Sequence, residues 1–340
     1  RTSTFSQLAY VLSLLVIPPL AIFIFIGIGT SNFFQTHGAS LWVRANDSIF
    51  NMANRHCDVL IFGDSTAMTG INPEIVQRST GSRTCNIAVT NAVLAVTNTL
   101  ALDHFLEHNG RPQILLLQFS PDEFESNSHE WSKSIYPEGL LELVRHGTAE
   151  QKRDLLLNHP RQAVAFAGYI AGYMSFYFLK QAWFSVSHQR AAEDTVIVRN
   201  GFFTPPAPAR TECEAEPPAA GPINQGFARS LAEGYRKAYA SRADHVLVDV
   251  APIPSCDPNL ATYDLELSGV TSNSLLPLPI TLFNDERHYT QAGSTEVSKL
   301  VSEQIDQLAG EKRPLQLRSY TNLSIGATRS SADLIPFGSR

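Results

Sequence analysis

Four short runs of nearly uninterrupted apolar residues constrain the fold of this chain more than any other feature of its sequence. They lie at 58–63, 85–89, 113–119 and 245–250. Runs of this length are typical of strands that are buried on both faces of a parallel sheet. Helical patterns separate the runs, at 92–108 and 226–240. This alternation predicts an α/β domain in which helices cover both faces of the sheet.

The apolar stretch 8–28 predicts a membrane-spanning helix near the N-terminus. It contains no charged residue, and a helix of this length matches the hydrocarbon core of a bilayer, about 30 Å thick. A cleaved signal peptide is the alternative, but the run is longer than the usual apolar region and no A-x-A-like site follows it. We therefore expect a single-pass anchor, with a weak preference for a cytoplasmic N-terminus from the sparse flanking charges.

The four cysteines favour an exported protein. They are Cys57, Cys85, Cys213 and Cys256, and none of them forms a C-x-x-C motif. Three pairings are possible. Neighbouring parallel strands would bring Cys57 close to Cys85, which favours this pair and leaves Cys213 for Cys256; four reduced, buried cysteines are the alternative. With the anchor, the even count predicts an inner-membrane protein whose body lies in the periplasm or outside the cell.

The segment 126–216 interrupts the alternation of strands and helices, and we expect it to be a mostly helical insertion. Its part 162–186 is rich in aromatic residues. This part is either a helix packed on the core or one that docks on a membrane surface or a partner. The predicted organisation is an anchor at 1–29, a linker at 30–54, the main domain at 55–312 and a C-terminal extension at 313–340.

Two short motifs contain the residues suited to nucleophilic catalysis. Ser65 directly follows the first predicted strand, in the sequence G-D-S. A serine on a tight turn between a strand and a helix exposes its hydroxyl and places a backbone N–H near a developing oxyanion. Asp285 lies three residues before His288, where a carboxylate can orient the imidazole and stabilise its protonated form. We predict Ser65 as nucleophile, His288 as base and Asp285 as its orienting group.

These motifs resemble the sequence blocks of the SGNH (GDSL-like) hydrolase superfamily. The G-D-S sequence that ends at Ser65 matches the first block, and the D-x-x-H sequence of Asp285 and His288 matches the last. Residues 86–92 resemble the second block, which usually reads like N-x-A-V-S-G-A. The resemblance implies a flavodoxin-like, three-layer α/β fold, and it places the backbone N–H of Asn91 in the oxyanion hole.

The third block departs from the family pattern. After the third strand the family has G-x-N-D, whose asparagine side chain donates to the oxyanion, whereas this chain has F-S-P-D with Pro121 in that place. Proline cannot donate a hydrogen bond, and one missing oxyanion donor costs about 100- to 1000-fold in rate. Ser120 and Asn127 are the candidate substitutes, and Asp64 is a further candidate binding residue beside the nucleophile.

A second sequence motif indicates which members of the superfamily the chain resembles. The sequence G-I-N-P at 70–73 follows G-D-S, similar to the G-D-S…G-I-D-P phrase of membrane-anchored SGNH-like proteins in bacterial envelope acylation systems, which include exopolysaccharide acetylation. The resemblance implies transfer of an acyl group, expected to be acetyl, from an acyl donor to a polysaccharide or other envelope glycan. It also implies a membrane-bound O-acyltransferase as partner. The alternatives are a membrane-tethered carbohydrate or lipid esterase and a non-catalytic partner of such an acyltransferase.

Charge and histidine spacing argue against other classes of function. The formal net charge of -6 provides no basic surface for nucleic acid, which we do not expect as a partner. The chain has no H-E-x-x-H or H-x-x-E-H motif, and no acidic third ligand is evident beside His104 and His108. We therefore expect neither a metal nor a cofactor.

Overall fold

A four-stranded parallel sheet, with the strand order β2-β1-β3-β4, forms the centre of the molecule. The computed structural model describes residues 4–32, 41–125, 137–170, 172, 201–202, 208–213 and 223–309. The strands are β1 (Val59–Gly63), β2 (Thr84–Asn86), β3 (Ile114–Phe119) and β4 (His245–Val250). Each lies in or overlaps one of the apolar runs, so the prediction of a parallel sheet is confirmed. A separate parallel pair joins β5 (Ile253–Pro254) to β6 (Pro277–Leu278).

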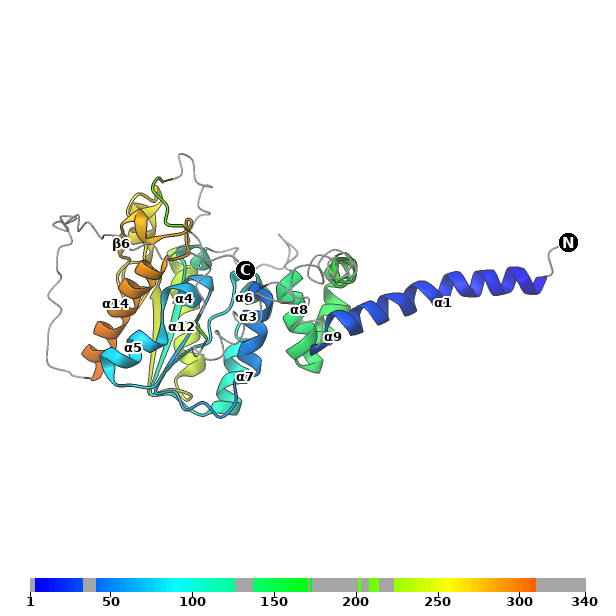
Figure 1. The fold of residues 1–340 in the computed structure, drawn as a ribbon, viewed down its shortest axis with the longest axis horizontal. Coiled ribbons are helices and arrows are strands. Elements are labelled where there is room, and N and C mark those ends of the chain that lie inside the picture. Colours follow the sequence, from blue (N-terminus) through cyan, green and yellow to red (C-terminus); the bar gives the residue numbers. More distant parts are fainter. Residues whose placement is uncertain are drawn as a thin grey trace, which may run out of the picture.

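Helices cover both faces of the sheet, because the strand side chains alternate between two buried clusters. On β1, Leu60 and Phe62 belong to one cluster, whereas Val59 and Ile61 belong to the other. The first cluster includes residues of α7 (Leu100–Asn109) and α12 (Gln225–Tyr239), and the second includes residues of α5 (Pro73–Thr80) and α14 (Gln291–Ala309). Figure 1 shows the strands between these two groups of helices. The predicted α/β class is therefore confirmed.

The predicted helix 92–108 is two helices, α6 (Asn91–Thr97) and α7. The break falls at Asn98, whose φ of 51° and ψ of -111° lie outside the helical region. Asparagine is enriched among the non-glycine residues that have a positive φ. The side-chain oxygen of Asn98 also accepts a hydrogen bond of 3.0 Å from the hydroxyl of Tyr235 in α12, which holds the break against the helix layer.

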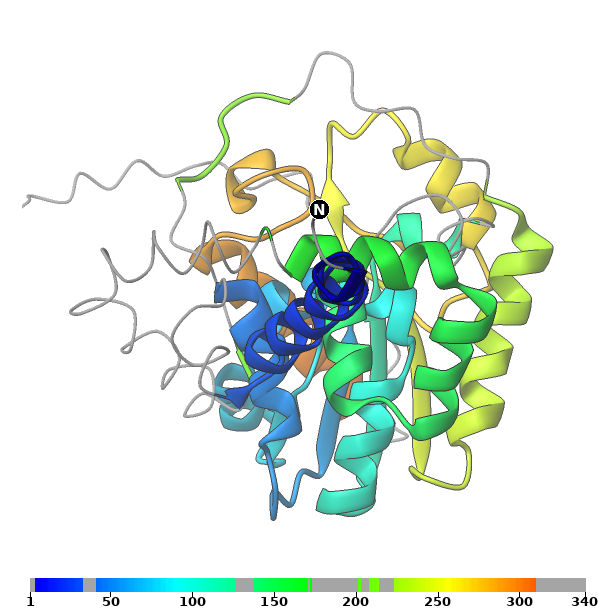
Figure 2. The same cartoon turned by 90° about the vertical axis from the view of Figure 1, so that its right-hand side faces the viewer.

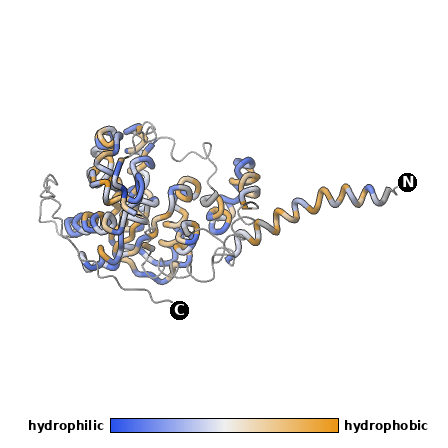
Figure 3. Tube along the Cα trace, turned by 45° about the horizontal axis from the view of Figure 1, so that its top comes forward, coloured by the Kyte–Doolittle hydropathy of each residue, from blue (hydrophilic) through white to orange (hydrophobic). Residues whose placement is uncertain are grey.

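Helix α1 (Thr4–Gly29) extends away from the α/β body (Figures 1 and 2). Apolar residues occur along most of its length (Figure 3). Its part Ser6–Gly29 has the length and composition of a membrane span, and none of the most apolar stretch is buried against the body. A signal sequence near an N-terminus meets the same test. The helix is thus a candidate anchor, by length and composition.

Half of the predicted linker 30–54 belongs to the body rather than to a connection. It contains α3 (Leu41–Phe50), the amphipathic part of the segment. Val43 and Ile49 are each 1% exposed, because the apolar side of α3 packs against the helices of the body.

A charged cluster holds the end of α1 against α3 and α8 (Pro137–His146). The guanidinium of Arg145 donates to the backbone oxygen of Thr30, 3.0 Å away, and lies 2.6 Å from a carboxylate oxygen of Asp47. His146 is 2.8 Å from the same oxygen and stacks on the ring of Phe50. A cation beside the last carbonyls of a helix is favourable, so Arg145 joins the candidate anchor to the body.

Most of the described part of the insertion is helical, apart from residues 201–202 and 208–213. After α8 come α9 (Ala149–Asn158) and a helical segment at 160–170. Phe166 and Ile170 are buried in a small cluster with Leu140 and Leu141 of α8. The start of the aromatic stretch therefore packs on the insertion's own core. Residues 173–186 and the predicted C-terminal extension 313–340 lie outside the described residues.

All four cysteines form disulfides, in the pairing that the sequence favours. Cys57 pairs with Cys85, with their Cα atoms 5.8 Å apart, and Cys213 pairs with Cys256, at 6.2 Å. The first bond ties the starts of two neighbouring strands together. Disulfides persist in oxidising compartments, which supports an exported body.

Asp249 in β4 generates a prediction about stability and pH. Its burial raises the pKa to about 7, although a hydrogen bond from Gln304 opposes the shift. The folded protein therefore holds this proton more tightly than the unfolded chain, where an aspartate has a pKa of about 3.9. We expect this group to lower the free energy of unfolding as pH rises from about 4 to about 7, by at most about 4 kcal/mol.

Urea denaturation of the wild type and of Asp249→Asn across this pH range measures the effect. The variant should lose this part of the pH dependence. The matched control is Asp244→Asn, since Asp244 has a half-exposed side chain (56%) just before the same strand. Identical pH slopes in the wild type and Asp249→Asn would contradict the prediction.

Candidate active site

Ser65 lies at the carboxyl end of β1, which pairs with β2 on one side and β3 on the other. It is the first residue of α4 (Ser65–Gly70). Gly63 makes this turn possible, because a Cβ at that position would collide with the backbone oxygen of Gln118 in β3. Because β1 has a strand on each side, Ser65 lies at the carboxyl edge of the sheet, between its outer strands. In α/β proteins the ligand sites lie at this edge.

Asp64 determines how α4 begins. One carboxylate oxygen accepts hydrogen bonds from the backbone N–H of Thr66 at 2.8 Å and from its hydroxyl at 2.5 Å. The other accepts the backbone N–H of Ser120, at 2.7 Å, from the end of β3. The side chain is almost fully buried, with Asp64 1% exposed. Asp64 therefore caps the helix and fixes the nucleophile loop to the neighbouring strand.

His288 connects Ser65 to Asp285. The Nε2 atom of His288 is 2.8 Å from Ser65 Oγ, and its Nδ1 atom is 2.6 Å from a carboxylate oxygen of Asp285. The second carboxylate oxygen accepts the backbone N–H groups of His288 and Arg287, at 2.7 and 2.8 Å. Partial burial acts to raise the pKa of Asp285, but the hydrogen bonds from His288 and Arg287 outweigh it and lower the pKa to about 2. The carboxylate therefore stays ionised at neutral pH.

The residues on either side hold His288 in place. Arg287 donates to both carboxylate oxygens of Asp122, at 2.9 and 3.2 Å, and to Asp257 at 2.8 Å. The buried Tyr289 donates its hydroxyl to the backbone oxygen of Pro252 at 2.6 Å. Its ring also lies against Gly70 at the end of α4, where a Cβ would collide with it. The histidine loop is thus tied to three other segments and to the helix that begins at Ser65.

Trp42 is a contact of the site that the sequence reasoning missed. Its ring centroid lies 5.4 Å from that of His288, with an angle of 43° between the ring planes. Trp42 belongs to α3, in the segment that was predicted to be a linker. The amphipathic pattern of this segment was the available signal, since it indicates a helix with one side against the body.

The side chain of Asn86 is hydrogen-bonded to the backbone of α4 and of the residue that follows it. Its amide donates to the backbone oxygens of Ala67 and Ile71, both at 2.8 Å, and its side-chain oxygen accepts the N–H of Ala88 at 3.0 Å. These bonds bind the end of α4 to the loop that follows β2. The same loop donates the N–H of Val89 to the backbone oxygen of Gly63, at 3.0 Å. The second block therefore runs directly beside the nucleophile turn.

The candidate oxyanion donors differ in which hydrogen-bond donor each can offer to a ligand. Asn91 begins α6, where the first N–H groups of a helix have no partner within the helix. Ser120 gives its backbone N–H to Asp64, so its hydroxyl is the group left for a ligand. Pro121 begins the 3₁₀ helix Pro121–Phe124 and has no N–H. Asn127 lies outside the described residues.

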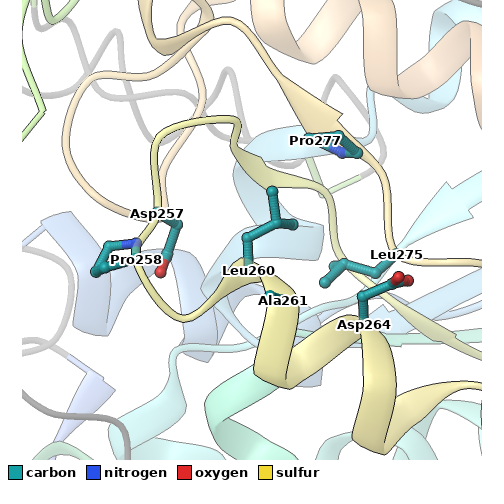
Figure 4. Close-up of a pocket in the computed structure, with 7 residues that line it drawn as sticks. All are labelled: Asp257, Pro258, Leu260, Ala261, Asp264, Leu275 and Pro277. Carbon is teal, nitrogen blue, oxygen red and sulfur yellow. The ribbon is translucent and has the colours of Figure 1, made fainter.

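A pocket of about 490 Å³ is lined by residues between 257 and 277 (Figure 4), and Ser65 and His288 are not among them. Its lining combines the carboxylates of Asp257 and Asp264 with apolar side chains that include Leu260 and Leu275. Asp257 also binds Arg287, the neighbour of His288. The disulfide at Cys256 holds the adjacent residue. The pocket therefore shares one carboxylate with the charge network of the histidine loop.

Among the described residues, one group of side chains could hold a metal ion by residue type and spacing. It lies in the charged cluster at the end of α1. The ligand atoms of Asp47, Glu142 and His146 lie within 4.8 Å of one another. However, Arg145 and His146 both contact the same oxygen of Asp47. A guanidinium at this position already compensates the negative charge, so we interpret the group as an ion-pair cluster.

No protein-family model and no curated protein matches this chain. The candidate site consequently rests on its own geometry.

The three hydrogen bonds of Asp64 generate a prediction. Asp64→Asn places an amide where a carboxylate oxygen accepts an N–H group, so one buried donor loses its acceptor. We expect a loss of about 1–3 kcal/mol in the free energy of unfolding. Asp58→Asn is the matched control, since Asp58 also accepts a backbone N–H but at the surface, from Arg83. Urea denaturation of both variants measures the difference, and an equal loss in the two would contradict a special role for Asp64.

Proposed function

We propose that Ser65, His288 and Asp285 form the catalytic triad of an SGNH-type acyltransferase. The observation that carries the proposal is the continuous hydrogen-bonded chain from Asp285 through His288 to Ser65, with distances of 2.6 and 2.8 Å. Two further observations support it. The strand order β2-β1-β3-β4 agrees with the start of the flavodoxin-like order, and the 86–92 block lies beside the nucleophile turn.

The proposed reaction has two steps, and Ser65, His288 and Asp285 take part in both. His288 Nε2 takes the hydroxyl proton as Ser65 Oγ attacks the carbonyl carbon of the acyl donor, and it then returns the proton to the leaving group. The product is an acyl-serine. In the second step His288 deprotonates a sugar hydroxyl, which attacks the acyl-serine and releases Ser65. The ionised Asp285 stabilises the imidazolium in both steps, and the N–H groups of Ser65 and Asn91 are the proposed donors to the oxyanion.

The proposed acceptor is a polysaccharide or another envelope glycan, and the proposed acyl group is acetyl. The pocket beside the site supports a sugar acceptor, since the exposed Asp264 can accept hydrogen bonds from hydroxyl groups while Leu260 and Leu275 offer apolar contacts. Helix α1 and the two disulfides support a body held outside the cytoplasm by a single inner-membrane span. A membrane-bound O-acyltransferase that supplies acyl groups is the proposed partner.

Two other functions fit part of the geometry. A membrane-tethered carbohydrate or lipid esterase would use the same triad, with water in place of the sugar hydroxyl. A non-catalytic partner of a membrane-bound O-acyltransferase is favoured by Pro121, which supplies no oxyanion donor. Product analysis with an activated acetyl ester, in the presence and absence of a glycan acceptor, distinguishes the transferase from the esterase.

Covalent labelling of the full chain with a serine-reactive fluorophosphonate tests the triad. We expect labelling of the wild type, and its loss in Ser65→Ala and His288→Ala, because the hydroxyl is nucleophilic only with its base. Ser79→Ala is the control, since Ser79 is an exposed serine near the end of α5, which leads to the start of β2 rather than to the carboxyl edge of the sheet. An unlabelled wild type with an intact circular dichroism spectrum would contradict the triad and favour the non-catalytic role.

The contact of Trp42 with His288 gives a second prediction for the same assay. Trp42→Ala removes the ring that packs on the imidazole, and we expect labelling to slow by about 10-fold or more, since misplaced catalytic groups are costly. Trp42→Phe should retain most of the rate because it keeps an aromatic ring. Thermal unfolding of each variant separates this effect from a general loss of structure. Equal rates in wild type and Trp42→Ala would show that the ring does not position the base.

A further inference from the structure

Exposed large apolar side chains are concentrated in the helical insertion. In the described chain outside α1, four such side chains are exposed, and three of them lie in α9 and the 160–170 helix. Leu156 and Leu157 are each 64% exposed, and Val164 is 75% exposed. The fourth is Leu265 in α13 (Leu260–Leu267). Single exposed apolar residues are common, but three of them on two consecutive helices exceed what the rest of the described body exposes.

The core of the insertion does not require these three side chains. Other residues of the same helices, Leu155, Phe166 and Ile170, are the ones that join the buried cluster with α8. Each helix therefore has apolar residues inside the protein and others outside it. We call Leu156, Leu157 and Val164 the exposed leucine–valine patch.

The patch belongs to the side of the body from which α1 departs. Figure 1 shows α8 and α9 at the base of α1, and Figure 2, the view turned toward this side, shows the insertion helices in front of the sheet. The connection is fixed by Arg145, which binds the backbone oxygen of Thr30 and the carboxylate of Asp47. A bilayer that α1 crosses would consequently lie next to this side of the body.

The charges around the patch suit the headgroup region of a membrane. Lys152 and Arg153 lie in α9, and Arg161 follows at the start of the next helix. Basic residues beside leucines are typical of helices that lie in a membrane interface. Glu150 and Asp154 share α9, so the attraction to anionic lipid is small and the apolar contacts dominate.

We propose that the exposed leucine–valine patch inserts into the boundary between headgroups and acyl chains of the same bilayer that α1 spans. The insertion thereby acts as a second, interfacial contact with the membrane. The two contacts together fix the tilt of the α/β body and its height above the lipid. The surface that carries the patch is thus lipid-facing.

Spin labels in the full chain test this placement. All four native cysteines are in disulfides, so Leu157→Cys, Val164→Cys and Leu265→Cys each introduce a single reactive thiol. The chain is reconstituted in nanodiscs of an equal mixture of phosphatidylcholine and phosphatidylglycerol. Collision with oxygen, which enriches in acyl chains, is then compared with collision with a water-soluble nickel chelate. Leu265 is the matched control, since it is 71% exposed and lies in α13, between β5 and β6 in the chain and outside the insertion.

The expected result is an oxygen-to-nickel ratio several times higher at positions 157 and 164 than at position 265. A label at Leu15→Cys in α1 confirms that the anchor is in the bilayer. Ratios at 157 and 164 equal to that at 265 would overturn the proposal, as would a water-exposed label at position 15. Protection of Leu157→Cys in native membranes but not in nanodiscs would replace the bilayer with a protein partner.

Discussion

The buried carboxylate of Asp64 is the interaction on which the candidate site depends. Through one oxygen it starts α4, and through the other it holds the end of β3 by the N–H of Ser120. Gly63 is what allows the two strands to approach so closely. A buried carboxylate is stable only when its oxygens are hydrogen-bonded, and here the same bonds direct Ser65 out of the sheet edge. The hydrogen bonds that stabilise the turn therefore also determine where Ser65 lies.

The histidine loop is held by a charge network as well as by apolar packing. Burial acts to lower the pKa of Arg287, but the carboxylates of Asp122 and Asp257, which accept its hydrogen bonds, outweigh this effect and raise the pKa above its usual value. Asp122 comes from the segment after β3, whereas Asp257 follows β5. One guanidinium thereby fastens three loops at the carboxyl side of the sheet. The imidazole of His288 is one residue from this junction, so its position follows from the arginine.

Features that leave a local pattern in the sequence were predictable, whereas features set by contacts between residues far apart in the sequence were not. Buried strands require continuous apolar runs, so the sheet, the disulfide pairing and the place of Ser65 were all visible in the sequence. The break at Asn98 was not, since asparagine is also compatible with a helix. The partners of Arg287 were hidden as well, because the acidic loop at 122–125 resembles a solvated surface in one dimension. Trp42 was missed for a related reason: a short amphipathic segment after an anchor carries no sign of which group it will contact.

The two halves of the proposed triad lie 223 residues apart in the sequence. A chain that is synthesised from its N-terminus presents Ser65 long before His288 emerges. During that interval Ser65 lacks its hydrogen bond to the imidazole, and the helix α14 that follows the histidine is not yet packed on the sheet. The proposed chemistry therefore requires almost the whole body to be folded, and a truncated chain that ends before His288 carries Ser65 without its proposed base.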